Sequence, residues 1–279
     1  MRVVVLASGS SGNAVVVESS ARVLLDAGIG PRALERTLAA SGLDPSRPFD
    51  GIVATHEHGD HFGGAEKLAR ALGCPVFAHD GITGARLRRR HDVRPYEIGR
   101  PFCVGDLELT AVTVPHDAPQ VALRVATPDF AVGYATDVGR VTDALVDLLG
   151  ACDAALVEAN HCTELLRQGP YPPHLKARIS SGLGHLSNRE VADLAARLEG
   201  SRLRGMLLGH VSRANNTADR ALATVRARAP WLDVDLVEQG EVRELRRPPP
   251  AAPGARARAW GQLALPFGPV GRAGHSRPV

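Results

Sequence analysis

The sequence lacks several features that would each point to a particular class of protein. Its four cysteines are widely separated and form no C-x-x-C pair, which favours free thiols in a reducing cytoplasm over a disulfide framework or a cysteine zinc site. No apolar run approaches the roughly 20 residues that a transmembrane helix needs. The apolar start at residues 1–5 has no signal-peptide cleavage pattern and reads as a first strand. We therefore expect a cytoplasmic protein without membrane contact.

The sequence also has almost no excess of positive over negative charge. The net charge is +3, but from Pro248 onward there are four arginines and no acid, so residues 1–247 carry about −1 (3 − 4). Bulk charge therefore does not argue for nucleic acid, and any phosphate recognition must come from local clusters. No G-x-G-x-x-G or G-x-x-x-x-G-K-[ST] phosphate loop occurs. We expect one domain at residues 1–247 and a disordered tail rich in Pro, Ala, Arg and Gly at 248–279.

Hydrophobic patterning predicts an α/β protein that begins and ends with strands. We expect strands at residues 2–6, 14–18, 22–26, 51–54, 74–78, 107–114, 120–127, 130–134, 154–158 and 205–209. We expect helices at residues 31–40, 62–72, 81–90, 140–149, 187–198 and 217–229. The segments 232–238 and 241–245 are predicted to pair as a closing hairpin around Gln239-Gly240. Residues 169–184, rich in proline, are expected to form a loop and a short helix over the functional site.

The most informative stretch is residues 55–61, which contain the pattern H-x-H-x-D-H. In extended chain, residues two apart point the same way, so His56 and His58 can share one metal ion. Gly59 lets the chain turn, and Asp60 and His61 then face a second site at the start of a helix. Imidazole and carboxylate suit zinc and neighbouring metals, and a turn of solvated histidines is the weaker alternative. The motif resembles that of the metallo-β-lactamase superfamily of binuclear metallohydrolases, which implies a four-layer αββα sandwich.

Three further ligand candidates follow predicted strands: His116, Asp137 and His210. Singly, a histidine at a strand end is more often a surface residue, but together they match the order of the superfamily's remaining ligands. The resemblance implies a first ion on His56, His58 and His116, and a second on Asp60, His61 and His210. Asp137 would bridge two divalent ions, zinc or else manganese, with a hydroxide between them as the nucleophile. Asp26 is expected to orient a ligand histidine, or otherwise to cap its strand.

His185 lies 25 residues before His210, and a helix and a strand between them would return the chain to the same edge. The pattern around it resembles the nuclease branch of the superfamily, including tRNA 3′-processing enzymes. That resemblance implies that His185 protonates the leaving oxygen, as phosphodiester hydrolysis requires. The alternative is a capping or orienting histidine.

A narrower resemblance covers residues 1–245. Segments 8–13, 158–161, 169–172, 175–179, 184–188 and 209–216 occur together in the order seen in the bacterial YycJ/WalJ family of metallo-β-lactamase-fold proteins. It implies a 5′→3′ DNA exonuclease associated with mismatch repair. Cys162 stands where the family pattern has an acidic residue after the histidine, so the role of His161 stays open.

Several residues are candidates for contact with substrate. Tyr171 can stack on a base, and Lys176 and Arg178 can contact phosphates. The alternative is a Tyr171 packed under its loop beside two solvated cations. Asn215, in the 209–216 segment, is a candidate for the substrate or for support of the ligands.

Other functions stay open from the sequence alone. The same chemistry could process RNA, or hydrolyse a small thioester, lactone or lactam. A binding module without activity is less consistent with a complete ligand set. In the tail, Gln262, Leu263, Leu265 and Phe267 resemble the peptides that bacterial proteins insert into the sliding clamp, although the segment could instead fold back on the domain.

Overall fold

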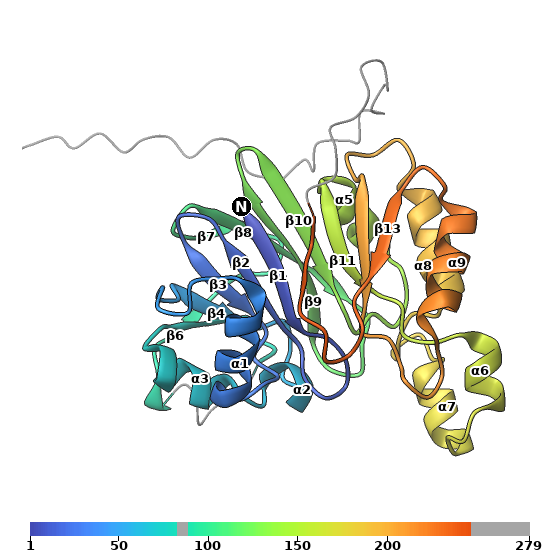
Figure 1. The fold of residues 1–279 in the computed structure, drawn as a ribbon, viewed down its shortest axis with the longest axis horizontal. Helices are drawn as coiled ribbons and strands as arrows, with labels where there is room; N and C mark the ends of the chain where they lie inside the picture. The colour runs from blue at the N-terminus through green and yellow to red at the C-terminus, as the bar shows by residue number, and fades with distance from the viewer. Residues whose placement is uncertain (83–88, 247–279) are drawn as a thin grey trace, which may run out of the picture.

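Two mixed β-sheets lie face to face at the centre of the computed structural model, which describes residues 1–82 and 89–246 (Figure 1). The first sheet has the order β14-β1-β2-β3-β4-β5-β6, and the second has the order β13-β12-β11-β10-β9-β8-β7. The strands of the first sheet are β1 (Arg2–Ala7), β2 (Ala14–Glu18), β3 (Arg22–Leu25), β4 (Gly51–Val53), β5 (Val76–Ala78), β6 (Val93–Pro95) and β14 (Arg243–Glu244). Those of the second are β7 (Phe102–Val104), β8 (Leu107–Val114), β9 (Gln120–Thr127), β10 (Phe130–Ala135), β11 (Ala154–Glu158), β12 (Gly205–Gly209) and β13 (Asp233–Leu236).

Helices cover the outer face of each sheet. The helices are α1 (Pro31–Ser41), α2 (Gly59–Phe62), α3 (Ala65–Leu72), α5 (Asp143–Gly150), α6 (Thr163–Gln168), α7 (Pro173–Ile179), α8 (Asn188–Arg197) and α9 (Ala218–Arg228). Side chains of α1 and α3 pack on the first sheet, and those of α5, α8 and α9 pack on the second. The layers therefore run αββα, as the sequence predicted.

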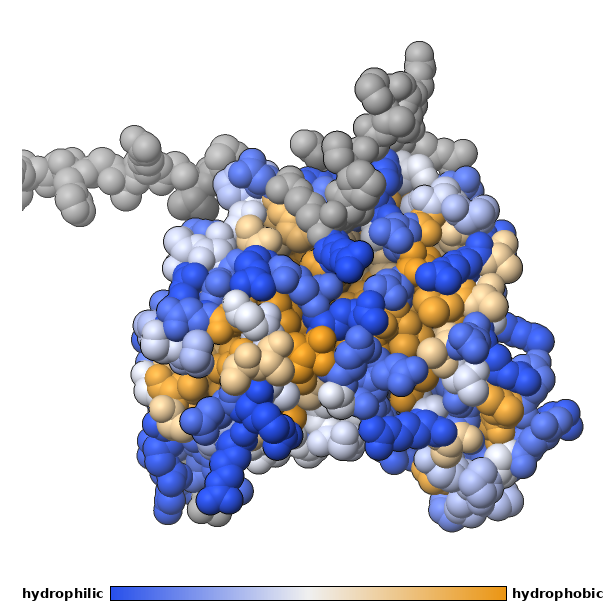
Figure 2. Space-filling model, viewed as in Figure 1, coloured by the Kyte–Doolittle hydropathy of each residue, from blue (hydrophilic) through white to orange (hydrophobic). Residues whose placement is uncertain are grey.

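The alternation of side chains along the strands explains the continuous apolar runs. In β2, Val15 and Val17 point into the core between the two sheets, whereas Val16 points to the layer under α1. Because both faces of these strands are buried, both must be apolar, and the polar-out pattern of a solvated sheet is lost. The face of the molecule shown in Figure 2 is a mosaic of hydrophobic and hydrophilic residues.

Helix ends follow local sequence signals closely. Pro31 begins α1, and Gly42 ends it in the left-handed conformation. Ser187 and Glu190 form both halves of a capping box at the start of α8, as their spacing predicted. Among the described residues, no helix is both long and apolar enough to cross a bilayer.

Three expectations about the elements were wrong. Residues 232–245 do not form a hairpin, because β13 pairs with β12 in one sheet and β14 pairs with β1 in the other. The helix expected at 62–72 is divided into α2 and α3 at Gly64, where a Cβ would lie 2.0 Å from the carbonyl oxygen of Ile29. The short edge strands β6 and β7 were missed. Most of the helix expected at 81–90 lies outside the described residues.

Candidate metal centre

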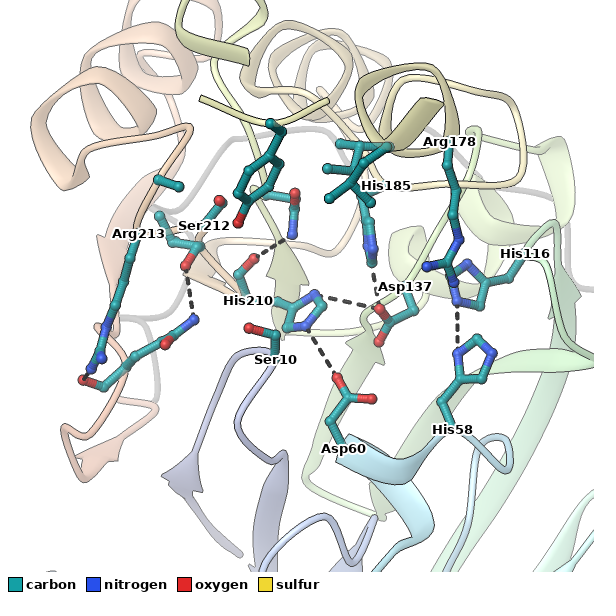
Figure 3. Close-up of a pocket in the computed structure, with 17 residues that line it drawn as sticks. Ser10, His58, Asp60, His116, Asp137, Arg178, His185, His210, Ser212 and Arg213 are labelled. Carbon is teal, nitrogen blue, oxygen red and sulfur yellow. Dashed lines mark hydrogen bonds and ion pairs between the residues drawn. The ribbon is translucent and has the colours of Figure 1, made fainter. Parts of the chain in front are cut away.

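The candidate ligands lie where strands of both sheets end (Figure 3). His56 and His58 follow β4, and α2 then carries Asp60 and His61. In the second sheet, β8, β10 and β12 are followed by His116, Asp137 and His210. The centre is therefore built at one common edge of the sandwich, with one group of side chains from each sheet.

The backbone is held in the left-handed region at three of these positions. Among the non-glycine residues that the structure describes, positive φ occurs at Asp26 (58°), Asp137 (56°) and His210 (49°). Such conformations cost roughly 1–3 kcal/mol each and persist where the surroundings enforce them. All three residues belong to the centre, so the strain is concentrated where side chains must converge.

Two sets of three side chains have their ligand atoms within 4.8 Å of one another: His56, His58 and His116, and Asp60, His61 and His210. In the first set, Nδ1 of His58 lies 3.3 Å from Nε2 of His116. In the second, Oδ2 of Asp60 lies 3.8 Å from Nε2 of His61 and 3.7 Å from Nε2 of His210. These separations fit atoms that share one ion.

Asp137 joins the two sets. It forms a further group with His56 and His61, again with ligand atoms within 4.8 Å. Its Oδ2 lies 2.5 Å from Nε2 of His61, and its Oδ1 lies 3.5 Å from Nδ1 of His210. Buried and placed between the sets, this carboxylate can reach ions in both.

The chemistry of the donors fits a pair of divalent cations. Nε2 of His56 and Nε2 of His210 are buried and have no hydrogen-bond partner among the residues that the structure describes. An unpaired buried polar atom costs roughly 1–3 kcal/mol, so such atoms need an explanation. Metal coordination supplies one, because mixed imidazole and carboxylate donors suit zinc and manganese.

Asp26 holds His61 in place. Its Oδ2 lies 2.7 Å from Nδ1 of His61 and accepts a hydrogen bond of 2.8 Å from the hydroxyl of Tyr134. The backbone N–H and the hydroxyl of Thr55 also donate to Asp26. Asp26 thus fixes the ring of a candidate ligand, which is the arrangement that the sequence predicted.

Glu158, at the end of β11, holds two histidines. Its Oε2 lies 3.1 Å from Nδ1 of His185 and 3.2 Å from Nδ1 of His210. The backbone N–H groups of Val138 and Leu186 donate to its Oε1. Glu158 was absent from the predicted site, although an acidic residue at the end of an apolar strand is the same signal that identified Asp137.

His185 has two possible roles in this geometry. It lines the cavity at the centre, and its Nδ1 also lies 3.3 Å from Oδ1 of Asp137. With Asp137, Glu158 and His210 it forms another group close enough to hold an ion. The held Nδ1 leaves Nε2 for the cavity, as an acid would require, and metal content will separate the two roles.

The charges of the centre shift the histidine pKa values in opposite directions. Burial lowers the pKa of His56 to about 3. Burial also disfavours the charged form of His61, but Asp137 and Asp26 outweigh it and raise the pKa to about 10. Burial lowers the pKa of His185, but the carboxylates of Glu158 and Asp137 together outweigh it, so that this pKa is raised. The centre is thus an anionic pocket that attracts cations.

A cavity of about 400 Å³ opens onto the centre. Tyr171 and Arg178 line it, as predicted for substrate contacts, and Ser10, Ser212 and Arg213 line it on other sides. Arg178 donates from Nε to Oδ2 of Asp117 at 2.7 Å. Burial opposes ionisation of Asp117, but this hydrogen bond together with the charges of His116, Arg178 and His58 outweighs it and lowers the pKa of the carboxyl. Asp117 was missed from the sequence, although it directly follows His116.

Three other predicted residues lie away from the cavity. Lys176 donates to the carbonyl oxygen of Arg167 at 2.9 Å and is not among the residues that line the cavity. Asn215 is buried, and its amide hydrogen-bonds to Ser212, so it supports a residue of the cavity wall. His161 is buried too and its Nδ1 has no hydrogen-bond partner, while the thiol of Cys162 donates to Glu164 at 3.0 Å. The tail residues Gln262, Leu263, Leu265 and Phe267 lie outside the described residues.

Comparisons with known proteins identify the family of the chain. Residues 21–210 match the model of the beta-lactamase superfamily domain. The chain is 36% identical over 231 residues to the exodeoxyribonuclease WalJ of Streptococcus pneumoniae D39, covering 79% of this chain and 85% of that protein. It is 32% identical over 228 residues to the exodeoxyribonuclease YycJ of Bacillus anthracis, covering 79% of this chain and 86% of the relative.

Solved structures show the same fold at lower identity. The metallo-beta-lactamase fold protein YhfI of Bacillus subtilis superposes with a TM-score of 0.66 at 16% identity, over 87% of this chain and 98% of that one. The family model covers more than half of the chain, and the two relatives are at least 32% identical to it over most of their own length. The chain therefore belongs to the WalJ/YycJ family of the metallo-β-lactamase superfamily.

Proposed function

We propose that this chain is a metal-dependent phosphodiesterase that degrades DNA from the 5′ end and serves mismatch repair. The observation that carries the reaction class is the convergence of seven His and Asp side chains, five of which line one cavity together with His185. The choice of DNA is supported by the two relatives, both named exodeoxyribonucleases. The polarity and the link to repair follow from the family resemblance.

The proposed ligand sets divide the seven side chains between two ions. His56, His58 and His116 would hold the first, Asp60, His61 and His210 would hold the second, and Asp137 would contact both. Bound there, divalent ions would act as Lewis acids on phosphate oxygens and bring the pKa of water toward neutrality. Asp60 and Asp137 would also offset part of the charge of two dications.

His185 would supply the proton for the leaving oxygen. An alkoxide is a poor leaving group, so cleavage of a phosphodiester needs an acid within hydrogen-bond reach. Glu158 orients the ring through Nδ1 and stabilises its protonated form, so that Nε2 can donate into the cavity. Arg178 and Tyr171 on the cavity wall would bind the phosphate backbone and a base without reading sequence.

The test uses the full chain loaded with Zn²⁺ or Mn²⁺ and presented with DNA and RNA strands labelled at either end. The proposal expects early release of short products from 5′-labelled DNA and loss of activity in Asp137→Ala. A thioester and a lactone are assayed in parallel. Cleavage of RNA alone, or of the esters alone, would overturn the DNA assignment, and two bound ions without any activity would favour a binding module.

We also propose that the tail docks on the sliding clamp, on the sequence of Gln262, Leu263, Leu265 and Phe267 alone. Two leucines and a phenylalanine can fill an apolar groove while Gln262 provides directional hydrogen bonds. The ordering cost of a short segment predicts weak, roughly micromolar affinity. Fluorescence polarisation of a peptide of residues 261–268 against the organism's own clamp tests this, with a scrambled peptide as control. Absence of binding at about 100 μM would reject clamp docking and leave the nuclease proposal intact.

A further inference from the structure

One candidate ligand, His58, is held differently from the others. Its side chain is 33% exposed, whereas those of His61 and His116 are 0% and 2% exposed. Nδ1 of His61 is held by a buried carboxylate, and Nδ1 of His116 lies 3.1 Å from the carbonyl oxygen of Gly184. In His58, Nδ1 is the ring nitrogen that faces His116, the other ligand candidate of its set. The nitrogen left for an orienting partner is therefore Nε2.

Asp117 occupies that position. Its Oδ1 lies 3.5 Å from Nε2 of His58 and 3.3 Å from Nε2 of His116. A carboxylate that receives the second N–H of a ligand imidazole fixes the ring orientation and raises its basicity, and loss of such a partner typically costs 10–100-fold in metal affinity. Asp117 is thus the orienting carboxylate of His58, as Asp26 is of His61, but its side chain is 28% exposed.

The other oxygen of Asp117 binds Arg178, which belongs to α7. The segment that contains α6 and α7, residues 163–179, is called the α7 arm below. Nε and one terminal nitrogen of Arg178 lie 2.7 Å and 2.5 Å from Oδ2. A guanidinium carries five N–H donors in a rigid fork, so two can bind Asp117 while others face a phosphate. Arg178 lies beside His116 and His58 on the cavity wall (Figure 3).

We propose that Asp117 is a positioning residue that couples the α7 arm to the first ion, because one carboxylate orients His58 with Oδ1 and fixes Arg178 with Oδ2. The proposal rests on the metal-dependent nuclease function and goes beyond it in assigning two tasks to a residue outside the ligand set. Substrate binding through Arg178 and ion binding through His58 then share one carboxylate, so they respond together when it is removed.

The experiment first measures metal affinity, which requires no substrate. Stepwise Zn²⁺ affinities of the full chain are measured by competition with a chromophoric chelator, for wild type, Asp117→Asn, Asp117→Ala and Arg178→Ala. The matched control is Asp143→Asn, which breaks a surface ion pair with Arg197, and neither of these two residues lines the cavity. Both Asp117 variants should lower the affinity for one of the two ions by about 10–100-fold and change the affinity for the other by less than about threefold. Arg178→Ala should leave the affinity for the second ion unchanged and should not weaken the first, because it frees Asp117 for His58, and the control should leave both affinities unchanged.

The second measurement is KM against kcat on an oligonucleotide at saturating metal. Arg178→Ala should raise KM more than it lowers kcat, because it removes a contact made in substrate binding. Arg178→Lys should recover only part of the loss, since it restores the charge without the fork. Asp117→Ala with Arg178→Ala should raise KM no further than Arg178→Ala alone, because the two residues act through one contact.

The outcomes separate this proposal from the one it rests on. Wild-type chain that binds no ion, or binds two ions without cleaving any phosphodiester, would overturn the nuclease function. Two bound ions with unchanged affinities in both Asp117 variants would overturn the positioning of His58. Additive effects on KM in the double variant would overturn the shared contact with Arg178.

Discussion

Replacement of His185 by alanine should slow phosphodiester cleavage while both ions remain bound. In the structure this side chain is fixed only through Nδ1, by Glu158 at 3.1 Å and Asp137 at 3.3 Å, and its other nitrogen is left for the cavity. Neither the His56, His58 and His116 set nor the Asp60, His61 and His210 set needs it. Removing an acid that acts only in the transition state lowers kcat and spares metal content.

The expected loss can be bounded. General acid catalysis contributes roughly 10²–10⁴-fold, which corresponds to about 2.7–5.4 kcal/mol in the activation free energy. The loss should shrink greatly on a diester with a p-nitrophenolate leaving group, because that group departs with little protonation. The ratio of the two losses therefore measures the acid role itself rather than general damage to the site.

The assay compares kcat/KM for a DNA oligonucleotide and a p-nitrophenyl phosphodiester, with metal content measured on the same samples. His174→Ala is the control, because it removes an exposed histidine from the neighbouring helix α7. Equal losses on the two substrates would refute the acid role. Loss of one ion in His185→Ala would instead make His185 a ligand through its group with Asp137, Glu158 and His210.

The ions should be essential to activity and should also stabilise the fold. Asp137→Ala should abolish activity and weaken binding of both ions while the circular dichroism spectrum stays near that of wild type, and an unchanged metal content would contradict its place between the sets. Metal analysis should give two ions per chain, and chelation should lower Tm, since an ion at 1,000 times its Kd adds about 4 kcal/mol to the free energy of unfolding. Metal affinity should fall as the pH falls, because protons compete for His61, whose pKa the carboxylates of Asp137 and Asp26 raise to about 10 against its burial. Calorimetry in buffers of different ionisation enthalpy should show proton release on binding, and proton uptake would refute this sign.

Local signals in the sequence predicted well those elements whose bounds are set by neighbouring residues. The strands at 107–114, 120–127, 154–158 and 205–209 have the predicted bounds, since apolar runs between turn residues define them. The closing hairpin failed for a different reason. Gln239-Gly240 does form a turn, with Gly240 at φ 90°, but strand pairing is decided by partners far away in the sequence. Each flanking segment adds to a different sheet, and nothing within residues 232–245 encodes that choice.

The site shows the same division between local and distant information. The candidate ligands were found because each follows a strand, and parallel strands bring their carboxyl ends to one edge. Their supporting carboxylates were harder to find, because their roles depend on which ring nitrogen faces the centre. Asp26 was predicted, whereas Glu158 and Asp117 were not. The direction of Lys176 could not be read from the sequence, because it depends on the turn of α7, which places the side chain against Arg167.

The supporting carboxylates differ in burial, and that difference bears on how the centre works. Asp26 and Glu158 are fully buried, and backbone N–H groups or hydroxyls satisfy their remaining oxygen sites. Such carboxylates are fixed whether or not substrate is bound. Asp117 is partly exposed and shares its charge with Arg178, a side chain that is itself 60% exposed. A phosphate that draws Arg178 away would leave more of the negative charge of Asp117 to His58. Substrate binding should therefore raise the affinity for the first ion. By linkage the first ion should then tighten substrate binding by the same factor.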